Sequence, residues 1–525
     1  MAELLLGIDS GSSSVKVCVY ARSGGLLGRS SRRMRLAHPR PSWAEMDADA
    51  IWSETAAAVR EAMNGVRGKV AGIGVSTACP TTVFLDGNLK PLRPAIVYLD
   101  GRSNRTVERF GERHGAAGHF ARTGNRLSCS TSWLANLAWL RENEPDTWKR
   151  VRRVSLLGGY LTLRMAGRPV VDWTQASYSG GFRVGDPGAG WDEALLAKWE
   201  IDKTLLAETG WSCLPAGVLN ADAARDMGIE PGAIVAFGSA DTAASAFALG
   251  MRNSGEIFES AGTSGVITFC LDRPLFDDAF MNRCHVFPGR WLAHGAMSTL
   301  GGAFNWLRQR VWPDLGGMEE LEDLAGKSPP GANGLVFLPY LAGERSPIWD
   351  PGASGLWLGL RMDHDRGDLI RAVFEGTAFG LKQIIERGKR FWGCSPDRLP
   401  GVGGGARSRL WSEIKSDILG VEYLCADEPD AAAWGAAAIG GVAAGAFSGV
   451  EDSDLRFIAA KSAQNTEPSR PNRLSARFNP HSRERREKYA NAFSVYETLY
   501  PALKTAMHDL AKNGLATASR LSLPR

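Results

Sequence analysis

Two short segments of this chain place glycine beside hydroxyl side chains at the same spacing. Residues 4–20 read LLLGIDSGSSSVKVCVY, and residues 255–270 read GEIFESAGTSGVITFC. The matched turn residues are Gly11 with Gly262, Ser12 with Thr263 and Ser13 with Ser264. Such a turn directs backbone N–H and side-chain O–H groups at one point, which suits an anion. Either turn alone would be an ordinary hairpin connection. Their repetition predicts two hairpins that hold the phosphates of one nucleotide from both sides.

Asp9 and Lys16 flank the first of these turns. Asp9 ends the first predicted strand, where a carboxylate beside phosphates requires a cation between them. A Mg²⁺ held through water satisfies that requirement, because Mg²⁺ keeps several waters and takes one or two carboxylates. The alternative for Asp9 is an Asx-turn. Lys16 begins the second strand, and it either reaches a phosphate or is solvated.

Asp241 lies where a predicted strand at 232–237 gives way to a helix of small residues at 242–249. Its carboxylate has two candidate roles, which are compatible. It can cap the backbone N–H of Ala243 or Ala244. It can also accept the proton of an alcohol during phosphoryl transfer, because ligands of α/β sheets bind at the carboxyl ends of strands.

A glycine loop opens an amphipathic helix at residues 401–418, GVGGGARSRLWSEIKSDI. Glycines let the backbone approach a ligand closely, and a helix N-terminus favours an anion or the adenine-ribose edge of a nucleotide. The loop is a weak match to a dinucleotide-binding fingerprint, since no clear β-branched strand precedes it. The phosphate loop G-x-x-x-x-G-K-[ST] is absent from the sequence.

These candidate groups depend on strands that alternate with helices. Three strands are predicted within 4–36 and a helix at 48–63 capped by Asp47, followed by strands at 70–76, 82–85 and 95–99. This order predicts an α/β fold with a mixed sheet covered by helices. The arrangement restarts after Gly255, which predicts domains at 1–250 and 251–460.

The last predicted region, 461–525, is a polar linker at 464–485 followed by a helical tail at 489–512. An apolar stretch at 431–447 is rich in alanine and glycine. Because it is only weakly hydrophobic, it predicts a buried helix in tight contact with its neighbours rather than a membrane span.

Composition indicates an ordinary enzyme. Among 525 residues, 61 Lys and Arg stand against 57 Asp and Glu, and a net charge of +4 is too small to indicate binding to nucleic acid or to a membrane. The 8 cysteines include no C-x-x-C pair, which argues against zinc sites and disulfide frameworks. No basic segment precedes the first strand, so no signal peptide is predicted and a cytoplasmic location is expected.

Motifs along nearly the whole chain resemble the FGGY family of carbohydrate kinases, with the greatest similarity to xylulokinases. Besides the turn at Asp241, they are DSGSSSVK at 9–16, WAEMD at 43–47, NLAWLRENEP at 136–145, AGTSG at 261–265, YLAGERSPIWD at 340–350, RAVFEG at 371–376 and GGGA at 403–406. Several of these motifs are specific by themselves, and their common order strengthens the resemblance.

The resemblance implies two ribonuclease-H-like domains of the actin and sugar-kinase superfamily that flank a cleft. Residues 1–250 would bind the sugar and residues 251–460 the nucleotide. The implied activity is ATP-dependent phosphorylation of a sugar or polyol hydroxyl, first of all in a ketopentose such as xylulose. The implied cofactors are ATP and Mg²⁺, the partner is a small sugar or polyol, and a homodimer is left open.

The resemblance also implies roles for individual residues. Asp241 matches the catalytic base and Asp9 the acidic residue near Mg²⁺. The positions expected to bind ATP or its phosphates are Ser12, Ser13, Lys16, Gly262, Thr263, Ser264, Gly301, Asn305, Gly404, Gly405 and Arg409. The positions expected near the sugar are Cys79, Pro80, Asp100, Arg102, Asp241 and Thr242, although Arg102 could equally pair on the surface.

The sequence departs from the family pattern in the sugar-binding loop. Residues 78–80 read ACP, where xylulokinases carry Gln-Met-His, and glycerol kinases have an Arg-Glu pair at the last two positions. Neither Ala78 nor Cys79 supplies a charged group, and Pro80 has no backbone N–H donor. Asn136 stands where the family usually has lysine.

These departures keep other functions in view. One is a noncatalytic sugar sensor with the kinase fold, and another is a kinase for a hexulose, tetritol or pentitol. A third alternative rests on the duplicated hairpins instead: an actin-like or chaperone-like ATPase, which would hydrolyse ATP without any sugar.

Overall fold

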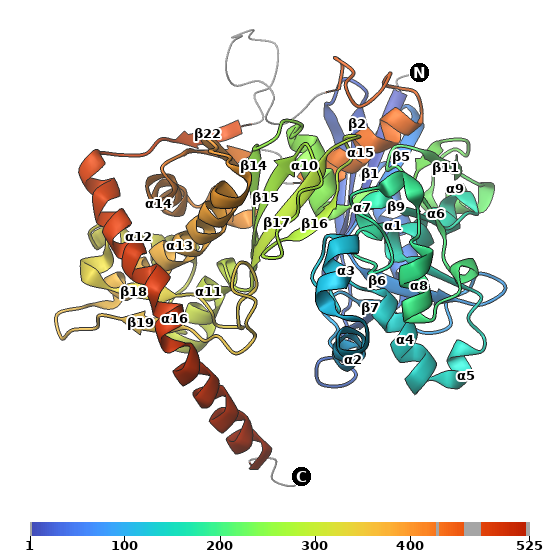
Figure 1. Ribbon diagram of the computed structural model, residues 1–525. Coiled ribbons are helices and arrows are strands. Elements are labelled where there is room, and N and C mark those ends of the chain that lie inside the picture. The colour runs from blue at the N-terminus through green and yellow to red at the C-terminus, as the bar shows by residue number, and fades with distance from the viewer. Residues whose placement is uncertain (1–2, 427–429, 456–473, 521–525) are drawn as a thin grey trace. The chain divides into compact units, whose positions relative to one another are not determined.

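The computed structural model describes residues 3–426, 430–455 and 474–520, which form two compact units (Figure 1). The first unit combines residues 1–253, 270–293 and 430–465, and the second combines 254–269, 294–429 and 466–525. Each unit is therefore assembled from stretches that are far apart in the chain. Part of the predicted tail region, 461–473 and 521–525, lies outside the described residues.

The first unit is built on a mixed sheet in the order β11-β12-β5-β1-β2-β3, with β13 paired to β5. Its strands are β1 (Glu3–Ser10), β2 (Ser14–Ala21), β3 (Leu26–Arg33), β5 (Lys69–Thr77), β11 (Pro215–Val218), β12 (Ile234–Ala236) and β13 (Ser239–Ala240). β5 runs parallel to β1, β12 and β13, whereas β2 runs antiparallel to β1 and β3. The predicted mixed sheet is confirmed.

Helix α1 (Ala48–Ala62) starts where the sequence predicts it. The Asp47 carboxylate accepts hydrogen bonds from the backbone N–H groups of Asp49 and Ala50 at 2.9 and 3.0 Å, so the predicted cap is confirmed. The helix packs on β2 and β3 and buries Ile51 and Val59 completely. Burial of each such side chain contributes about 1.5–3 kcal/mol to folding.

The predicted buried helix at 431–447 is α15 (Ala431–Ala443), which packs against β1 and β5. A Cβ atom on Gly7 or Gly74 would lie 1.9 or 1.8 Å from a backbone oxygen of α15. Glycine in these strands therefore permits a very close approach of helix and sheet. Among the described residues, no helix has both the length and the apolar character needed to cross a membrane.

The rest of the first unit surrounds a smaller sheet in the order β4-β7-β6-β8. Its strands are β4 (Glu45–Met46), β6 (Thr81–Leu85), β7 (Ala95–Val97) and β8 (Arg153–Leu156), and β9 (Val170–Asp172) pairs with β10 (Glu208–Gly210). The other elements are α2 (Asn104–His114), α3 (Ala116–Thr123), α4 (Leu134–Asn143), α5 (Pro145–Trp148), α6 (Leu157–Ala166), α7 (Trp173–Ala176), α8 (Glu193–Trp199), α9 (Ala221–Met227), α10 (Asp241–Leu249) and β16 (Met281–Cys284).

The second unit has a sheet in the order β17-β15-β14-β20-β21-β22. The strands are β14 (Ile257–Ala261), β15 (Gly265–Leu271), β17 (Trp291–Met297), β20 (Arg398–Val402), β21 (Glu422–Ala426) and β22 (Leu474–Phe478). β20 leads directly into the glycine loop, so a strand precedes the loop although the sequence shows no clear β-branched strand there. Its sequence, RLPGV, has a weak strand propensity. Parallel pairing with both β14 and β21 outweighs that propensity.

The second unit also contains the helices α11 (Gly301–Trp306), α12 (Met318–Lys327), α13 (Arg366–Trp392), α14 (Arg409–Leu419) and α16 (Arg483–Arg520). Of these, α14 packs on β21 and β22 of the sheet, and α12, α13 and α16 pack on α14. The short strands β18 (Val336–Leu338) and β19 (Leu356–Leu358) form a separate hairpin. Single helical turns occur at Pro187–Ala189 and Lys203–Leu205 in the first unit and at Leu307–Val311, Ala332–Gly334 and Gly404–Arg407 in the second.

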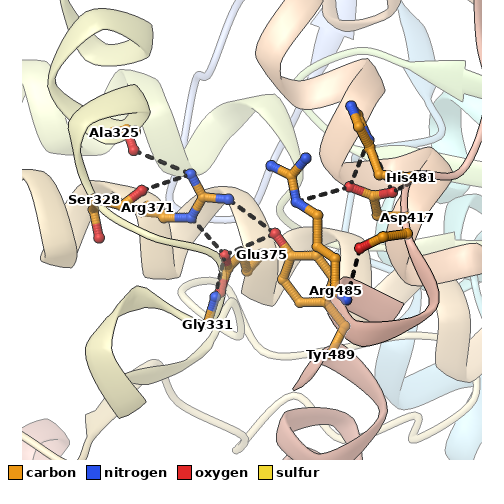
Figure 2. A network of polar contacts seen from close by, with 10 residues as sticks. Ala325, Ser328, Gly331, Arg371, Glu375, Asp417, His481, Arg485 and Tyr489 are labelled. Atoms are coloured by element: carbon orange, nitrogen blue, oxygen red, sulfur yellow. Dashed lines mark hydrogen bonds and ion pairs between the residues drawn. The ribbon is translucent and has the colours of Figure 1, made fainter. Parts of the chain in front are cut away.

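The C-terminal tail packs back as a helix, as predicted, and two polar clusters attach it to the second unit (Figure 2). In one cluster, the Tyr489 hydroxyl accepts from Arg371 Nη2 at 2.9 Å and donates to Glu375 Oε1 at 3.1 Å. In the other, the Asp417 carboxylate accepts from the His481 backbone N–H at 2.6 Å and lies 3.3 Å from Arg485 Nε.

We predict that Tyr489→Phe lowers the free energy of unfolding by about 1–3 kcal/mol, because it leaves Arg371 and Glu375 buried with one partner fewer. Urea denaturation of the purified variant measures this change. Ser494→Ala, at an exposed position of α16, is the control and should change stability by less than about 0.5 kcal/mol. Equal stability of the two variants would contradict a stabilising role for the Tyr489 cluster.

Candidate active site

Two of the predicted site residues meet at the carboxyl ends of neighbouring parallel strands in the first unit. Asp9 on β1 and Ser239 on β13 are both in register with Ser76 on β5. Ser76 Oγ donates a hydrogen bond of 2.7 Å to Asp9 Oδ1. Asp241 follows β13 directly. The parallel pairing thus brings Asp9 and Asp241 to one edge of the sheet, where α/β proteins bind ligands.

The environment of Asp9 is strongly acidic. Burial, followed by the negative charge of Asp241, raises the pKa of Asp9 to about 6, while the Ser76 hydrogen bond and Lys16 act in the opposite direction. Among the described residues, no group of three or more His, Cys, Asp or Glu side chains could hold a metal ion by itself. A single carboxylate with a second one nearby fits Mg²⁺ that arrives with phosphate ligands.

Asp241 is the first residue of α10, and its side chain keeps partial exposure. Its Oδ1 accepts from the Thr242 backbone N–H at 2.7 Å, and the N-cap position belongs to Ala240. The predicted capping of Ala243 or Ala244 is therefore wrong, because the helix begins one residue earlier than the sequence suggested. Burial raises the pKa of Asp241, and the positive charge of Arg283 opposes that shift.

The first predicted phosphate turn is a hairpin of residues 11–13 between β1 and β2. The Gly11 N–H donates to the Ser14 carbonyl at 2.9 Å, Ser12 is partly exposed and Ser13 is exposed. The hairpin is confirmed, and phosphate binding by its serines stays a prediction.

Lys16 forms an ion pair of 3.0 Å with Asp430, whose side chain is only 3% exposed. The start of α15 carries Asp430 to this position. Neither expectation for Lys16, a phosphate contact or simple solvation, included this partner. If Lys16 binds a phosphate, as predicted, the phosphate shares the Lys16 ammonium group with Asp430.

The second predicted phosphate turn, residues 262–264, is also a hairpin, between β14 and β15. The N-terminus of α11 is hydrogen-bonded to this turn. The Gly301 N–H donates to the Gly262 carbonyl at 3.0 Å, and the Gly302 N–H donates to the Thr263 carbonyl at 2.9 Å. Gly301 therefore lies at the turn, and Asn305 is exposed on the same short helix. Ser264 is partly exposed within the turn.

The glycine loop lies beside the same turn. A Cβ atom on Gly405 would be 3.1 Å from Cβ of Ala261, the last residue before the turn. Gly404 has no atom within 4 Å of such a Cβ position, so space is open there. Arg409 is mostly exposed and pairs with Glu413 at 3.1 Å. The structure thus gathers the predicted nucleotide positions of the second unit at the carboxyl ends of β14 and β20, and the role of Arg409 stays a prediction.

A buried ion pair that the sequence analysis missed lies behind this glycine loop. Lys415 Nζ on α14 is 2.7 and 2.9 Å from the two carboxylate oxygens of Glu259 on β14. The Tyr423 hydroxyl donates to the same carboxylate at 2.5 Å. A Cβ atom on Gly401 would lie 2.1 Å from the Tyr423 hydroxyl oxygen. The charged pair, fully buried, therefore supports the strand that leads into the loop.

Asp100 and Arg102, predicted near the sugar, belong to a buried cluster. Arg102 donates to Asp100 from Nε and Nη2 at 2.8 and 2.7 Å, and its Nη2 is 2.7 Å from Glu45. Its guanidinium lies 3.7 Å from the centroid of the Trp43 ring. The alternative that Arg102 pairs on the surface is wrong, since neither side chain of the Asp100 pair is exposed. Contact of these residues with a sugar stays a prediction.

The predicted sugar-binding loop follows β5. The Ala78 N–H donates to the Ser10 carbonyl at 3.1 Å, which joins the loop to the strand before the first phosphate turn. Cys79 is partly exposed and Pro80 is buried. Burial raises the pKa of the Cys79 thiol, so it stays protonated at neutral pH. Thr242 Oγ1 has no hydrogen-bond partner among the described residues.

Asp172, a buried carboxylate that the sequence analysis missed, connects this loop with the segment before Asp241 through two chains of hydrogen bonds. Asp172 Oδ2 accepts from Gln175 Nε2 at 2.7 Å, and Gln175 Oε1 accepts from Thr77 Oγ1 at 3.3 Å. Asp172 Oδ1 accepts from the Thr174 N–H at 2.9 Å, and Thr174 Oγ1 accepts from the Ala240 N–H at 2.7 Å. Aspartate directly before a short helix, at its N-cap position, was the available signal.

Comparison with known proteins decides the family. Residues 4–248 match the N-terminal domain, and residues 258–444 the C-terminal domain, of the FGGY family of carbohydrate kinases. The chain belongs to the FGGY family of carbohydrate kinases. The predicted resemblance, the fold class and the assignment to an enzyme that transfers a phosphoryl group to a sugar are confirmed.

Individual relatives of this carbohydrate kinase match it along nearly their whole length. A xylulose kinase of Staphylococcus xylosus is 27% identical and covers 94% of this chain and 99% of its own. A gluconokinase of Bacillus subtilis is 26% identical over 86% of this chain and 90% of its own. The solved xylulose kinase of Rhodospirillum rubrum is 28% identical, with a TM-score of 0.86, and covers 96% of this chain and 100% of its own.

The buried carboxyl group of Asp172 makes the free energy of unfolding of the kinase depend on pH. Burial raises the pKa of Asp172 from 3.8 to about 6, so the folded protein favours the protonated carboxyl group. The resulting stabilisation of the folded state is fully present below the unfolded pKa and is lost as the pH rises through 6. We predict that the stability of Asp172→Asn relative to wild type increases between pH 4 and 6 by up to about 3 kcal/mol. Urea denaturation at several pH values measures this difference. Parallel pH curves for the two proteins would contradict it.

Proposed function

We propose that this kinase transfers the γ-phosphate of ATP to a hydroxyl of a ketopentose such as xylulose, with Asp241 as general base. One observation carries the proposal: a partly exposed carboxylate stands at the carboxyl edge of the first sheet, beside Asp9. Phosphoryl transfer to an alcohol needs such a group within reach of the hydroxyl proton.

The remaining roles follow from the same geometry. Asp9 is the candidate ligand of Mg²⁺, which would supply positive charge against the phosphates when bound. The backbone N–H and hydroxyl groups of the turns at 11–13 and 262–264 are the candidate phosphate donors. All predicted sugar positions lie in the first unit, and the predicted positions from Gly262 to Arg409 lie in the second. This division supports sugar binding by the first unit and nucleotide binding by the second.

The relatives support the choice of a ketopentose. Several xylulose kinases and a gluconokinase occur among the matched proteins. One name refers to a neutral ketose and the other to a sugar acid, so xylulose and gluconate are the principal candidates to compare.

Coupled measurement of ADP release tests the proposal with ATP, Mg²⁺ and a panel of xylulose, ribulose, gluconate, glycerol and xylitol. We expect sugar-dependent ADP release with the highest kcat/KM for xylulose. ADP release that no sugar stimulates would overturn the proposed reaction. A higher kcat/KM for a substrate of another class would overturn the proposed substrate.

A further inference from the structure

Arg283 is a buried cation whose guanidinium is not saturated by the protein. It lies on β16 with 4% of its surface exposed, and its Nε and Nη1 have no hydrogen-bond partner among the described residues. A buried guanidinium with free N–H groups is costly unless a ligand supplies acceptors. The sequence analysis assigned no role to Arg283.

The strand holds Arg283 in a defined orientation. On one side of it in the chain, the Asn282 N–H donates to Asn125 Oδ1 at 2.7 Å, and on the other the Cys284 N–H donates to Ser177 Oγ at 3.0 Å. With the backbone held on both sides, the direction of the Arg283 side chain is set, because successive side chains of a strand point to opposite faces. Its position is therefore fixed before any ligand binds.

Tyr178 lies directly against this guanidinium. Cζ of Arg283 is 4.0 Å from the centroid of the Tyr178 ring, which is the geometry of a cation–π contact. Tyr178 is 3% exposed, and its hydroxyl interacts directly with the Arg283 guanidinium. The hydroxyl has no other hydrogen-bond partner in the described part of the chain. Nε and Nη1 of Arg283 and the proton of the Tyr178 hydroxyl therefore remain available as donors at the same place.

This place adjoins the candidate general base and the sugar-binding loop. Helix α7 packs on both β13, which ends directly before Asp241, and β16, which carries Arg283. In agreement with this placement, Arg283 and Asp241 act on each other electrostatically, and both act on the Cys79 thiol and the Tyr178 hydroxyl. Thr242 Oγ1, beside Asp241, is a further polar atom without a partner among the described residues. The free donors therefore belong to the surroundings of the proposed reacting hydroxyl.

We propose that Arg283 and Tyr178 are substrate-binding residues that donate hydrogen bonds to adjacent oxygen atoms of a neutral sugar. They supply the polar contacts that residues 78–80 lack. The inference rests on the proposed function and adds two specificity-determining residues to it.

The charges around Arg283 favour a neutral substrate over a sugar acid. Its positive charge stabilises the ionised form of Asp241 and so opposes the effect of burial on that carboxyl group. Asp9 adds a second carboxyl group that interacts with Asp241. A carboxylate on the substrate would bring one more negative charge to this group, which raises its energy. Hydroxyl or carbonyl oxygens accept the same hydrogen bonds without that cost.

The test compares Arg283→Lys, Arg283→Met and Tyr178→Phe with wild type, using xylulose as the neutral ketose and gluconate as the sugar acid. We expect kcat/KM for xylulose to fall about 10²-fold to 10³-fold in Arg283→Met and about 10-fold to 10²-fold in Arg283→Lys. Tyr178→Phe should lose about 3-fold to 10-fold. The loss should appear mainly as a higher KM for the sugar, with the KM for ATP changed less than about 3-fold.

Tyr160→Phe is the matched control, because the Tyr160 hydroxyl donates to Asp49 on α1 and faces no predicted sugar group. Its KM for xylulose should equal that of wild type. If Arg283→Met does not fold, Arg283→Lys keeps the positive charge and tests the planar donor geometry.

Two results would overturn the inference. One is a KM for xylulose within about 3-fold of wild type in a folded Arg283 variant, which is less than the loss of one hydrogen bond. The other is a preference of the wild-type enzyme for gluconate over every neutral sugar. Calorimetric binding of xylulose without ATP separates this inference from the proposed function. Absence of turnover with retained, Arg283-dependent sugar binding would reject only the proposed reaction.

Discussion

Asp241→Asn should lower kcat for sugar phosphorylation by about 10²-fold to 10⁴-fold, the usual size of a general-base effect. An amide of nearly the same shape cannot accept the proton of the substrate hydroxyl. It can still accept the hydrogen bond from the Thr242 N–H, which the carboxylate accepts now. The change should therefore fall on kcat and leave the KM for the sugar nearly unaltered, as measured by coupled ADP release at saturating ATP.

Folding of the Asp241→Asn variant should be preserved. The pKa of Asp241 is raised, so its charged form is disfavoured in the native protein and a neutral amide is tolerated there. Asp222→Asn is the control, since Asp222 is an exposed aspartate on α9 in the same unit. A folded Asp241→Asn enzyme with turnover close to that of Asp222→Asn would remove Asp241 from the role of general base.

Lys415→Met should lower the free energy of unfolding by about 3–5 kcal/mol, because it leaves the Glu259 carboxylate buried without its cation. The loss should be concentrated in the second unit. Amide hydrogen exchange in β14, β20 and β21 measures it, since these strands lie beside the ion pair. Loosening of β20 should also raise the KM for ATP if the glycine loop that follows it binds the nucleotide.

Lys203→Met provides the matched control for Lys415→Met. Lys203 and Glu193 form an ion pair of 2.9 Å whose side chains are 55% and 78% exposed. Exposed pairs of this kind typically contribute less than about 1 kcal/mol. If both substitutions have equally small effects, the buried pair of Lys415 is not a stabilising element.

Local sequence was sufficient for the features that depend on neighbouring residues. The two hairpin turns, the Asp47 cap and the start of α10 within one residue all follow from short patterns. The family assignment also followed from the sequence, because several specific motifs occur in one order along the chain. Glycine and hydroxyl positions in a turn, or a cap before a helix, carry their own structural cause.

Short sequence patterns did not predict the contacts between distant parts of the chain. The ion pair of Lys16 with Asp430, the burial of Arg102 and the pairing of β20 each require two segments that only folding brings together. Arg283 looks like any other arginine until β16 places it against Tyr178. Residue types and their spacing therefore located the two turns and a candidate general base. Burial and long-range pairing decided which charges are paired and which donors remain free. The physical reason is that the energy of a charge depends on its surroundings, and those surroundings exist only in the folded chain.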